Sequence, residues 1–214
     1  MRRLSAILFA LTGLLAAPAA RAGAQLYEPL SASVQAALSR AVSDQTVPRS
    51  AFRTPIEERA WLSEMSGRLQ KQIPEPGFRE DFLRTVHYEA TRAGLDPQLV
   101  LGLIQVESGF RKYAVSTAGA RGLMQVMPFW SKLIGGKDDN LFHLRTNLRY
   151  GCTILRHYLD MEKGDLFRAL GRYNGSLGKP EYPNLVRSVW EGRWTYIPPQ
   201  RYAATPATPP ASRN

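Results

Sequence analysis

Cysteine is almost missing from this chain, because Cys152 is the only one among its 214 residues. A single cysteine excludes a disulfide within the chain and any metal site built from several thiolates. The three histidines, His87, His143 and His157, lack the spacing of zinc ligands. The motifs of a serine-hydrolase elbow and of a phosphate-binding loop are absent as well. We therefore expect neither a metal nor another cofactor.

Long apolar runs are also missing from the body of the chain, so no internal membrane-spanning helix is predicted. At its start, a basic dipeptide precedes an apolar stretch from Leu4 to Ala17, and Ala20-Arg21-Ala22 fits a small-x-small cleavage pattern. These features are typical of a secretory signal peptide. We predict cleavage near Ala22, with Ala24 as the second option, and a periplasmic or secreted protein. An uncleaved N-terminal anchor is the alternative.

Basic residues outnumber acidic residues by 28 to 18, which gives a net charge of +10. Removal of residues 1–22 takes away three arginines and no acid, so the charge falls to +7. Such a charge favours an anionic partner, and for an exported protein the cell wall or a membrane surface is a better candidate than nucleic acid. Because the basic residues are scattered, a solvated basic surface is an equally good explanation.

Apolar residues repeat with helical spacing through most of the chain, and no segment alternates convincingly with period two. The predicted fold is therefore mainly α. Thr54-Pro55 and Asp96-Pro97 each combine a capping residue with a proline suited to the first helical position. The apolar spacing predicts helices near residues 34–42, 55–69, 78–90, 97–108, 141–159, 166–173 and 182–189, and a short helical turn at residues 122–127.

Glu107 interrupts an apolar pattern near the end of the helix predicted over residues 97–108. It lies four residues after Leu103 and three after Ile104, both of which belong to the apolar stripe. Its carboxyl group is therefore expected to point toward the core or a cleft. Burial raises the pKa of a carboxyl group, and such a group can hold a proton near neutral pH and give it to a leaving oxygen. The alternative is a helix-end glutamate that reaches solvent or pairs with Arg111.

Three short segments follow one another in a specific order. Val106-Glu107-Ser108-Gly109-Phe110 precedes Gly122-Leu123-Met124-Gln125-Val126-Met127-Pro128, and Ala169-Leu170-Gly171-Arg172-Tyr173-Asn174-Gly175 comes later. In this order and at this spacing they resemble the soluble lytic transglycosylase domain, a lysozyme-like fold that cleaves bacterial peptidoglycan. The resemblance covers roughly Phe82 to Trp190 and implies a lysozyme-like catalytic domain over residues 78–194. Local sequence patterns predict the other parts: a signal peptide over 1–22, a partly helical N-terminal extension over 23–77 and a Pro-rich, disordered tail over 195–214.

The resemblance assigns a role to each matching position. Glu107 would be the catalytic acid and base, and Tyr173 would hydrogen-bond near its carboxylate. The other substrate-binding positions would be Ser116 beside the reacting sugar, Gln125 and Met127 in the glycan groove, Asn174 in the same wall, and Tyr182 just before the last helix. Ordinary structural roles remain as alternatives: Met127 can belong to the core, Gln125 can lie on the surface, and Asn174 can form a turn with Gly175.

The chain departs from the family pattern around Tyr173. Arg172 stands where the family usually has a small residue, and Gly175-Ser176 stand where the family often has Ala-Gly. We therefore expect the groove near Tyr173 to differ in shape or charge.

Glu107 has no obvious carboxylate partner, since Asp138 and Asp139 lie in a Gly-Gly-Lys-Asp-Asp loop typical of solvated turns. Ordinary glycosidases use two carboxylates. A single one suits the transglycosylase reaction that the resemblance implies, in which the muramic C6 hydroxyl closes on C1 to leave a 1,6-anhydro end. The expected partner is the peptidoglycan glycan strand, bound by a monomer, with a wall-spanning secretion or pilus machine as an open further partner. A hydrolytic lysozyme-type muramidase and an idle peptidoglycan-binding scaffold are the competing hypotheses.

Overall fold

The computed structural model describes residues 25–43, 51–136 and 138–197, so the predicted signal peptide and most of the predicted tail lie outside the described residues. Within these ranges the chain is helical, with two isolated β-bridges and no strand, which confirms the mainly α prediction. No helix there has the length and apolar character to cross a membrane. The elements are α1 (Ala32–Ser43), α2 (Pro55–Leu69), α3 (Pro76–Arg92), α4 (Pro97–Ser108), α5 (Pro128–Ile134), α6 (Leu144–Met161), α7 (Leu166–Asn174), α8 (Glu181–Val189) and the π-helix η1 (Trp190–Trp194).

Capping residues fix the starts of two helices where the sequence predicts them. The Thr54 hydroxyl accepts a 3.1 Å hydrogen bond from the Glu57 amide at the start of α2. The Asp96 carboxylate accepts a 2.7 Å bond from the Gln98 amide at the start of α4. Each bond satisfies an amide that has no partner inside its helix. The position of α4, which carries Glu107, thus follows from local sequence.

The structure differs from the predicted helical turn at residues 122–127. Arg121 forms isolated antiparallel bridges with both Val115 and Val126, so the chain doubles back here instead of coiling. Gly122 has a φ of +78°, and a Cβ at this position would lie 2.4 Å from the Asn147 amide nitrogen. Only glycine fits that space and that backbone conformation.

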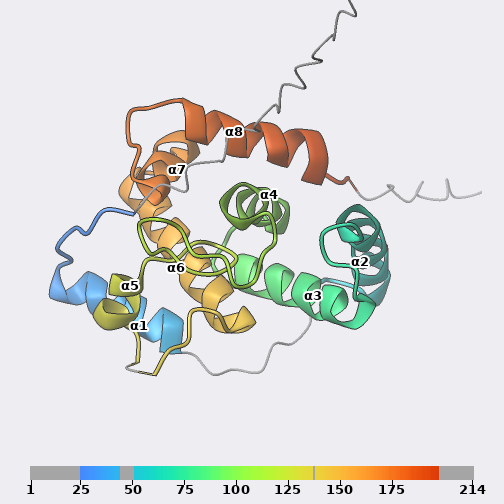
Figure 1. Ribbon diagram of the computed structural model, residues 1–214, viewed down its shortest axis with the longest axis horizontal. Helices are drawn as coiled ribbons and strands as arrows, with labels where there is room; N and C mark the ends of the chain where they lie inside the picture. Colours follow the sequence, from blue (N-terminus) through green and yellow to red (C-terminus); the bar gives the residue numbers. More distant parts are fainter. Residues whose placement is uncertain (1–24, 44–50, 137, 198–214) are drawn as a thin grey trace, which may run out of the picture.

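Helix α4 lies at the centre of the molecule (Figure 1) and packs against α3, α8 and η1. Its residues Leu101, Leu103 and Ile104 are fully buried. η1 approaches α4 so closely that a Cβ on Gly102 would lie 3.0 Å from the Trp190 Cβ and 3.1 Å from its Cα. Neighbouring elements therefore hold α4 from several sides.

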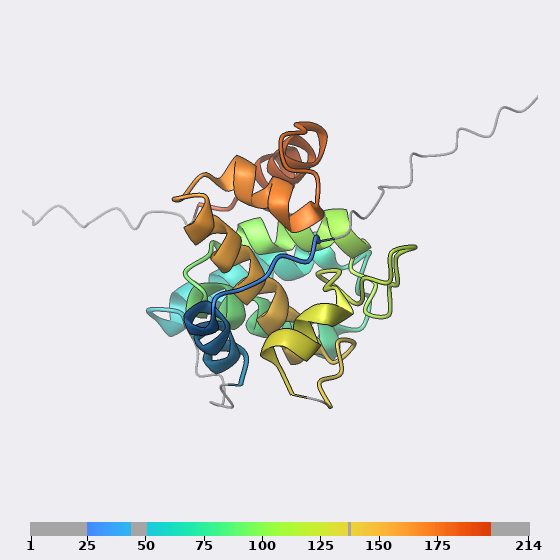
Figure 2. The same cartoon turned by 90° about the vertical axis from the view of Figure 1, so that its left-hand side faces the viewer.

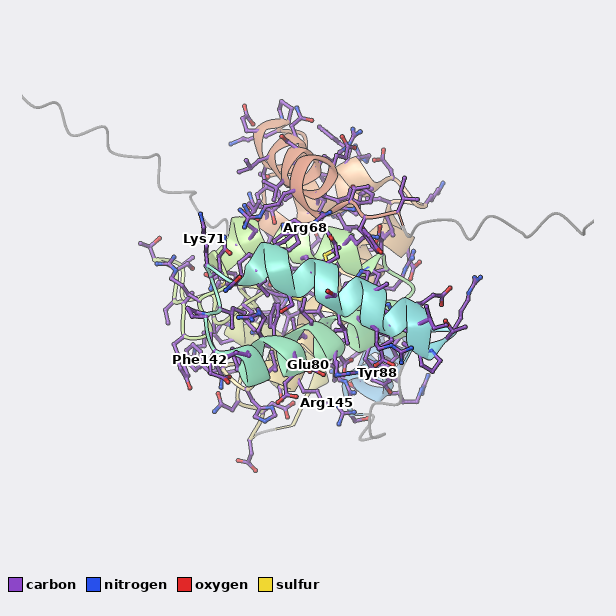
Figure 3. The ribbon with its side chains drawn as sticks, turned by 90° about the vertical axis from the view of Figure 1, so that its right-hand side faces the viewer. Arg68, Lys71, Glu80, Tyr88, Phe142 and Arg145 are labelled. Atoms are coloured by element: carbon purple, nitrogen blue, oxygen red, sulfur yellow. The ribbon has the colours of Figure 1, made fainter. Side chains whose placement is uncertain are left out.

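A buried ion cluster joins α3 to α6. Glu89 is fully buried, and Arg149 of α6 donates to its two oxygens at 3.1 and 2.8 Å. Arg92 and Arg145, the second of which is labelled in Figure 3, approach the same carboxylate at 3.0 and 3.4 Å. Three guanidinium groups offset the cost of burying this charge, and removal of a single partner is expected to be destabilising.

Hydrogen bonds connect the predicted N-terminal extension to the C-terminal end of the described chain. Arg68 of α2 donates to the carbonyls of Arg193 and Thr195 at 2.5 and 3.1 Å, and Arg193 donates back to the Arg68 carbonyl at 3.0 Å. Figure 3 shows Arg68 on the side of α2 that faces the C-terminal helices. Between these contacts and α4, the fully buried Trp194 donates to the Gln105 side chain at 2.9 Å. We call this set of contacts the terminal clasp.

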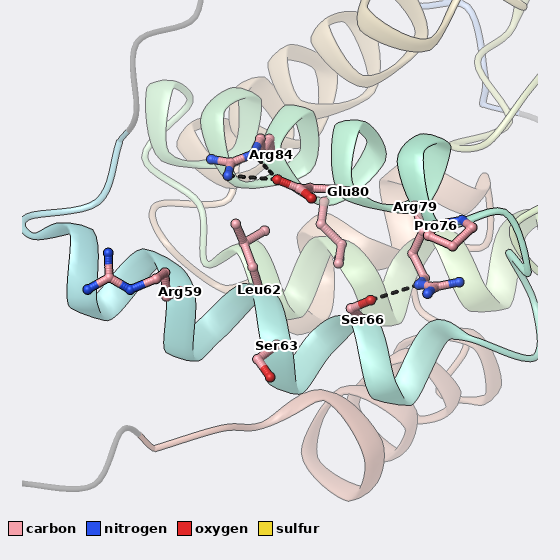
Figure 4. A pocket seen from close by; sticks show the side chains of 9 residues that line it. Arg59, Leu62, Ser63, Ser66, Pro76, Arg79, Glu80 and Arg84 are labelled. Atoms are coloured by element: carbon pink, nitrogen blue, oxygen red, sulfur yellow. Dashed lines mark hydrogen bonds and ion pairs between the residues drawn. The ribbon is translucent and has the colours of Figure 1, made fainter.

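A hollow of about 430 Å³ opens between α2 and α3 (Figure 4). Arg79 within it donates to the Ser66 hydroxyl at 2.7 Å, and Arg84 pairs with Glu80 at 2.8 Å. These polar groups already have partners within the fold, and Glu107 is not among the residues that line the hollow. The candidate site is therefore found elsewhere, around α4, α7 and α8.

Candidate active site

Glu107 lies in the last turn of α4 and is 7% exposed. Its Oε1 accepts a hydrogen bond from the hydroxyl of Tyr182, which comes from α8. The predicted inward orientation of the carboxyl group is thus confirmed. Arg111, the alternative partner considered from sequence, donates its Nε to the Ser108 carbonyl at 2.9 Å.

Burial raises the pKa of Glu107 to about 8, while the hydrogen bond from Tyr182 acts in the opposite direction and offsets only part of this rise. The cause is the loss of water around the charged form of the carboxyl group. Most Glu107 side chains therefore carry a proton at neutral pH. A protonated carboxyl group held in one orientation is suited to general acid catalysis.

Two tyrosines surround this carboxyl group in different ways. Tyr182 contacts it directly, whereas the Tyr173 hydroxyl donates to the Met124 carbonyl at 2.7 Å. Burial raises the pKa of both phenols well above the ordinary value, and the Glu107 charge raises them further. Both phenols thus remain protonated donors. The resemblance placed Tyr173 next to the carboxylate and gave Tyr182 a lesser role, but the direct hydrogen bond belongs to Tyr182.

Gln125 occupies the turn that leads into α5, and it is 3% exposed. Its φ of +47° lies in the left-handed region, which costs a residue with a side chain about 1–2 kcal/mol. The side-chain amide offsets this strain by donating to the carbonyls of Gly122 and Ala114 at 2.8 and 3.2 Å. The amide therefore holds the loop together, and the backbone carbonyl of Gln125 contacts a residue outside that loop.

The remaining predicted residues occupy neighbouring positions of the loop and α7. The Ser116 hydroxyl accepts a 3.0 Å hydrogen bond from the Ala120 amide and so closes a turn. Met127 precedes α5, and its half-buried side chain packs against the core. Asn174 ends α7, and its amide donates to the Ser176 hydroxyl at 3.0 Å. The hydrogen bonds of Ser116 and Asn174 are thus local contacts that shape their own turns.

Asn147 of α6 is a site-shaping residue that the sequence analysis did not single out. It is 1% exposed, accepts from the Met124 amide at 2.8 Å, and donates to the carbonyls of Arg121 and Leu141 at 2.9 and 2.8 Å. It therefore fixes both sides of the loop that carries Gln125. The sequence does contain a hint of this role. Leu148 belongs to the apolar stripe of α6, and Asn147 is a polar residue directly before it.

Gln25, at the beginning of the described chain, is the second residue without a predicted role. Its side chain is buried against Gln125, Met127 and Tyr173. No local pattern marks it, because its contacts lie 100 and 102 residues away along the sequence.

The two acids considered as partners for Glu107 lie in the loop between α5 and α6. Both Asp138 and Asp139 are exposed, and Asp139 accepts hydrogen bonds from the Tyr150 hydroxyl and, at 2.9 Å, from the Gly136 amide. The influences on the pKa of Glu107 are burial and Tyr182, without a contribution from another acid of the described ranges. The arrangement is therefore that of a single buried carboxyl group with a phenol partner.

The described residues offer little support for a cysteine nucleophile or for a metal site. Cys152 is fully buried, and burial raises the pKa of its thiol far above the ordinary value, which makes it a poor nucleophile. In the described part of the chain, no group of three or more His, Cys, Asp or Glu side chains is placed to hold a metal ion.

The segment that contains Glu107 and its neighbours is similar to known proteins. Residues 84–182 match the family model of the transglycosylase SLT domain, a range that contains Glu107, Gln125, Tyr173 and Tyr182. A transglycosylase of Enterobacteria phage PRD1 is 35% identical over 104 residues, which cover 49% of this chain and 38% of the phage protein. A membrane-bound lytic murein transglycosylase C of Glaesserella parasuis is 41% identical over 92 residues, which cover 37% and 25% of the two chains.

Among solved structures, an inactive mutant of the lytic transglycosylase Slt from Pseudomonas aeruginosa is similar. It has a TM-score of 0.41 and 22% identity, over 63% of this chain and 26% of that chain. The aligned part of this chain spans between about a quarter and two-fifths of the length of the two curated relatives.

Proposed function

We propose that this chain, whose residues 84–182 match the family model of the transglycosylase SLT domain, is an exported peptidoglycan lytic transglycosylase. Its substrate is the β-1,4 bond between N-acetylmuramic acid and N-acetylglucosamine, and its product is a 1,6-anhydromuramic end. The observation that carries the proposal is Glu107, a buried carboxyl group with a pKa of about 8. Export is part of the proposal because the first 22 residues have the pattern of a signal peptide.

In the first step, the protonated Glu107 donates its proton to the oxygen of the glycosidic bond. The C1–O bond then breaks, and the acetamido oxygen of the muramic sugar can share the positive charge that develops at C1. Glu107 is left as a carboxylate in a buried place, where it is a stronger base than it would be in water. The Tyr182 hydroxyl already donates to Oε1 and stabilises that charge.

In the second step, the Glu107 carboxylate takes the proton of the C6 hydroxyl of the same muramic sugar. The C6 oxygen bonds to C1, which closes the 1,6-anhydro ring and returns Glu107 to its protonated form. No water is consumed. Because the attacking hydroxyl belongs to the reacting sugar, proximity replaces the second carboxylate that a hydrolytic enzyme would use. The single-carboxyl arrangement supports this route over hydrolysis.

The test is mass analysis of the fragments released from purified peptidoglycan. We expect 1,6-anhydro ends, and we expect Glu107→Gln to reduce their release by about 10³-fold, within the range of about 10²–10⁴-fold that general acid catalysis contributes. Fragments one water heavier, from a preparation that needs Glu107, would identify a hydrolytic muramidase. Activity within tenfold of the parent chain in Glu107→Gln would refute the assignment of Glu107. Binding without release of fragments would leave a scaffold protein.

A further inference from the structure

The first described segment, residues 25–31, has no regular secondary structure and precedes α1; we call it the N-terminal arm. Figure 2 shows it in blue, leaving α1 and running in front of α6 toward the loop that carries Gln125. Its exposure is the reverse of the usual pattern, because Leu26 and Tyr27 are 61% and 62% exposed while Gln25 is 4% exposed. Tyr27 packs edge-on against Phe129 with 5.7 Å between the ring centroids, and Leu30 packs against the core, so apolar contacts hold part of the arm. The polar contacts of Gln25 and Glu28 hold the rest.

The Gln25 side chain uses both ends of its amide. Its Nε2 donates to the Gln125 carbonyl at 3.3 Å, and its Oε1 accepts from the Met127 amide at 3.1 Å. It also hydrogen-bonds with Tyr173, whose ring lies within electrostatic reach of Glu107. The arm is thus linked to Tyr173, a residue whose pKa is raised by burial and further by the charge of Glu107. An acetamido group, which every sugar of the glycan strand carries, offers the same N–H donor and C=O acceptor as the Gln25 amide.

A second anchor fixes the arm on the neighbouring helix. Arg172 of α7 donates to the Glu28 carboxylate at 2.8 Å and also pairs with Glu162. Arg172 is the residue that stands where the family usually has a small side chain before Tyr173. The departure from the family pattern and the position of the arm are therefore connected, because this arginine supplies the charge that holds Glu28.

We propose that the N-terminal arm is an internal competitor of the glycan, in which the Gln25 amide occupies the backbone carbonyl of Gln125 and the backbone amide of Met127 in place of a sugar acetamido group. This inference rests on the proposed function. The arm must leave before a glycan strand can lie along the Gln125–Met127 segment. The apparent affinity for the glycan is then lower than the affinity of the open form, in proportion to the fraction of molecules whose arm is released.

The test compares glycan binding with and without the Gln25 amide. In the Glu107→Gln background, which keeps the probe intact, tetra-N-acetylchitotetraose is titrated into the exported protein and into its Gln25→Ala variant. Loss of two or three hydrogen bonds should release the arm and tighten binding by about three- to tenfold. Glu28→Gln, which weakens only the Arg172 anchor, should tighten binding less. Gln70→Ala, at an exposed glutamine directly after the last residue of α2, is the matched control.

A second readout uses the enzyme with Glu107 intact. Gln25→Ala should lower KM for peptidoglycan by a similar factor and leave kcat within twofold, because the arm does not touch the reacting bond. Unchanged or weaker binding of the tetrasaccharide by Gln25→Ala would overturn the inference, while release of 1,6-anhydro fragments by the same preparation would keep the proposed function. If no preparation released fragments or bound the tetrasaccharide, the proposed function would fail and this inference with it.

Discussion

Replacing Glu107 with glutamine should change how the free energy of unfolding depends on pH. The folded chain holds a proton on Glu107 up to a pH of about 8, whereas the same carboxyl group has an ordinary pKa of 4.5 when solvated. Between these values unfolding releases that proton, so this group makes the parent chain progressively less stable as pH rises. Glutamine has nearly the same shape and carries no proton to lose.

The size of this stability change follows from the pH range between the two pKa values of Glu107. Each pH unit inside it changes the free energy of unfolding by about 1.4 kcal/mol for a single proton. From pH 5.5 to pH 7.5, Glu107→Gln should therefore gain about 2–3 kcal/mol of stability relative to the parent chain. Below about pH 4.5 the two proteins should keep a constant difference, because the carboxyl group is then protonated in both states.

Urea denaturation, followed by circular dichroism at several pH values from 4 to 8, measures this difference directly. Glu181→Gln is the matched control, because Glu181 is exposed in the first turn of α8 and the same charge is removed. Its stability difference should vary by less than about 0.5 kcal/mol over the same range. Parallel curves for Glu107→Gln and the parent chain would refute the raised pKa and, with it, the view that Glu107 carries a proton at neutral pH.

Three further predictions follow from the same contacts. Tyr182→Phe removes the hydrogen bond that lowers the pKa of Glu107, so the alkaline limb of the rate profile should move to higher pH while kcat falls; an unmoved limb would contradict this. Gly102→Ala should destabilise the fold by about 1–3 kcal/mol in thermal melts, because its Cβ would meet the Trp190 backbone. Sedimentation with intact walls should show weaker binding above about 0.1 M salt, where charges are screened beyond about 10 Å; salt-independent binding would exclude a role for the net positive charge.

Features that depend on neighbouring residues in the sequence were predictable. The start of α4 follows from Asp96-Pro97, and the inward orientation of Glu107 follows from its spacing to Leu103 and Ile104. Both are properties of a single helix, for which side-chain direction is set by the period of the backbone. The most important residue of the candidate site could therefore be found before any tertiary contact was known.

Features that depend on how segments meet were not predictable in the same way. The hydrogen bond from Tyr182 to Glu107 joins residues 75 positions apart, and which tyrosine reaches the carboxylate depends on how α7 and α8 turn against α4. Gln125 has a positive φ and turns its amide into its own loop, and a sequence motif reveals neither feature. The contacts of Gln25 span 100 residues and follow no spacing rule.

The terminal clasp shows that the limits of sequence similarity and the limits of the packed structure are different. Similarity to the family ends at residues 84 and 182, but the contacts of Arg68 with Arg193 and of Trp194 with Gln105 reach past both ends. A piece of chain cut at the limits of similarity would lose Trp194 and expose the side of α4 that it covers. The segment that matches the family is therefore shorter than the part of the chain that we expect to fold and unfold together. Backbone amides of α2, η1 and α4 should accordingly exchange with solvent deuterium in one concerted opening, so that the outermost elements report on the helix that bears Glu107.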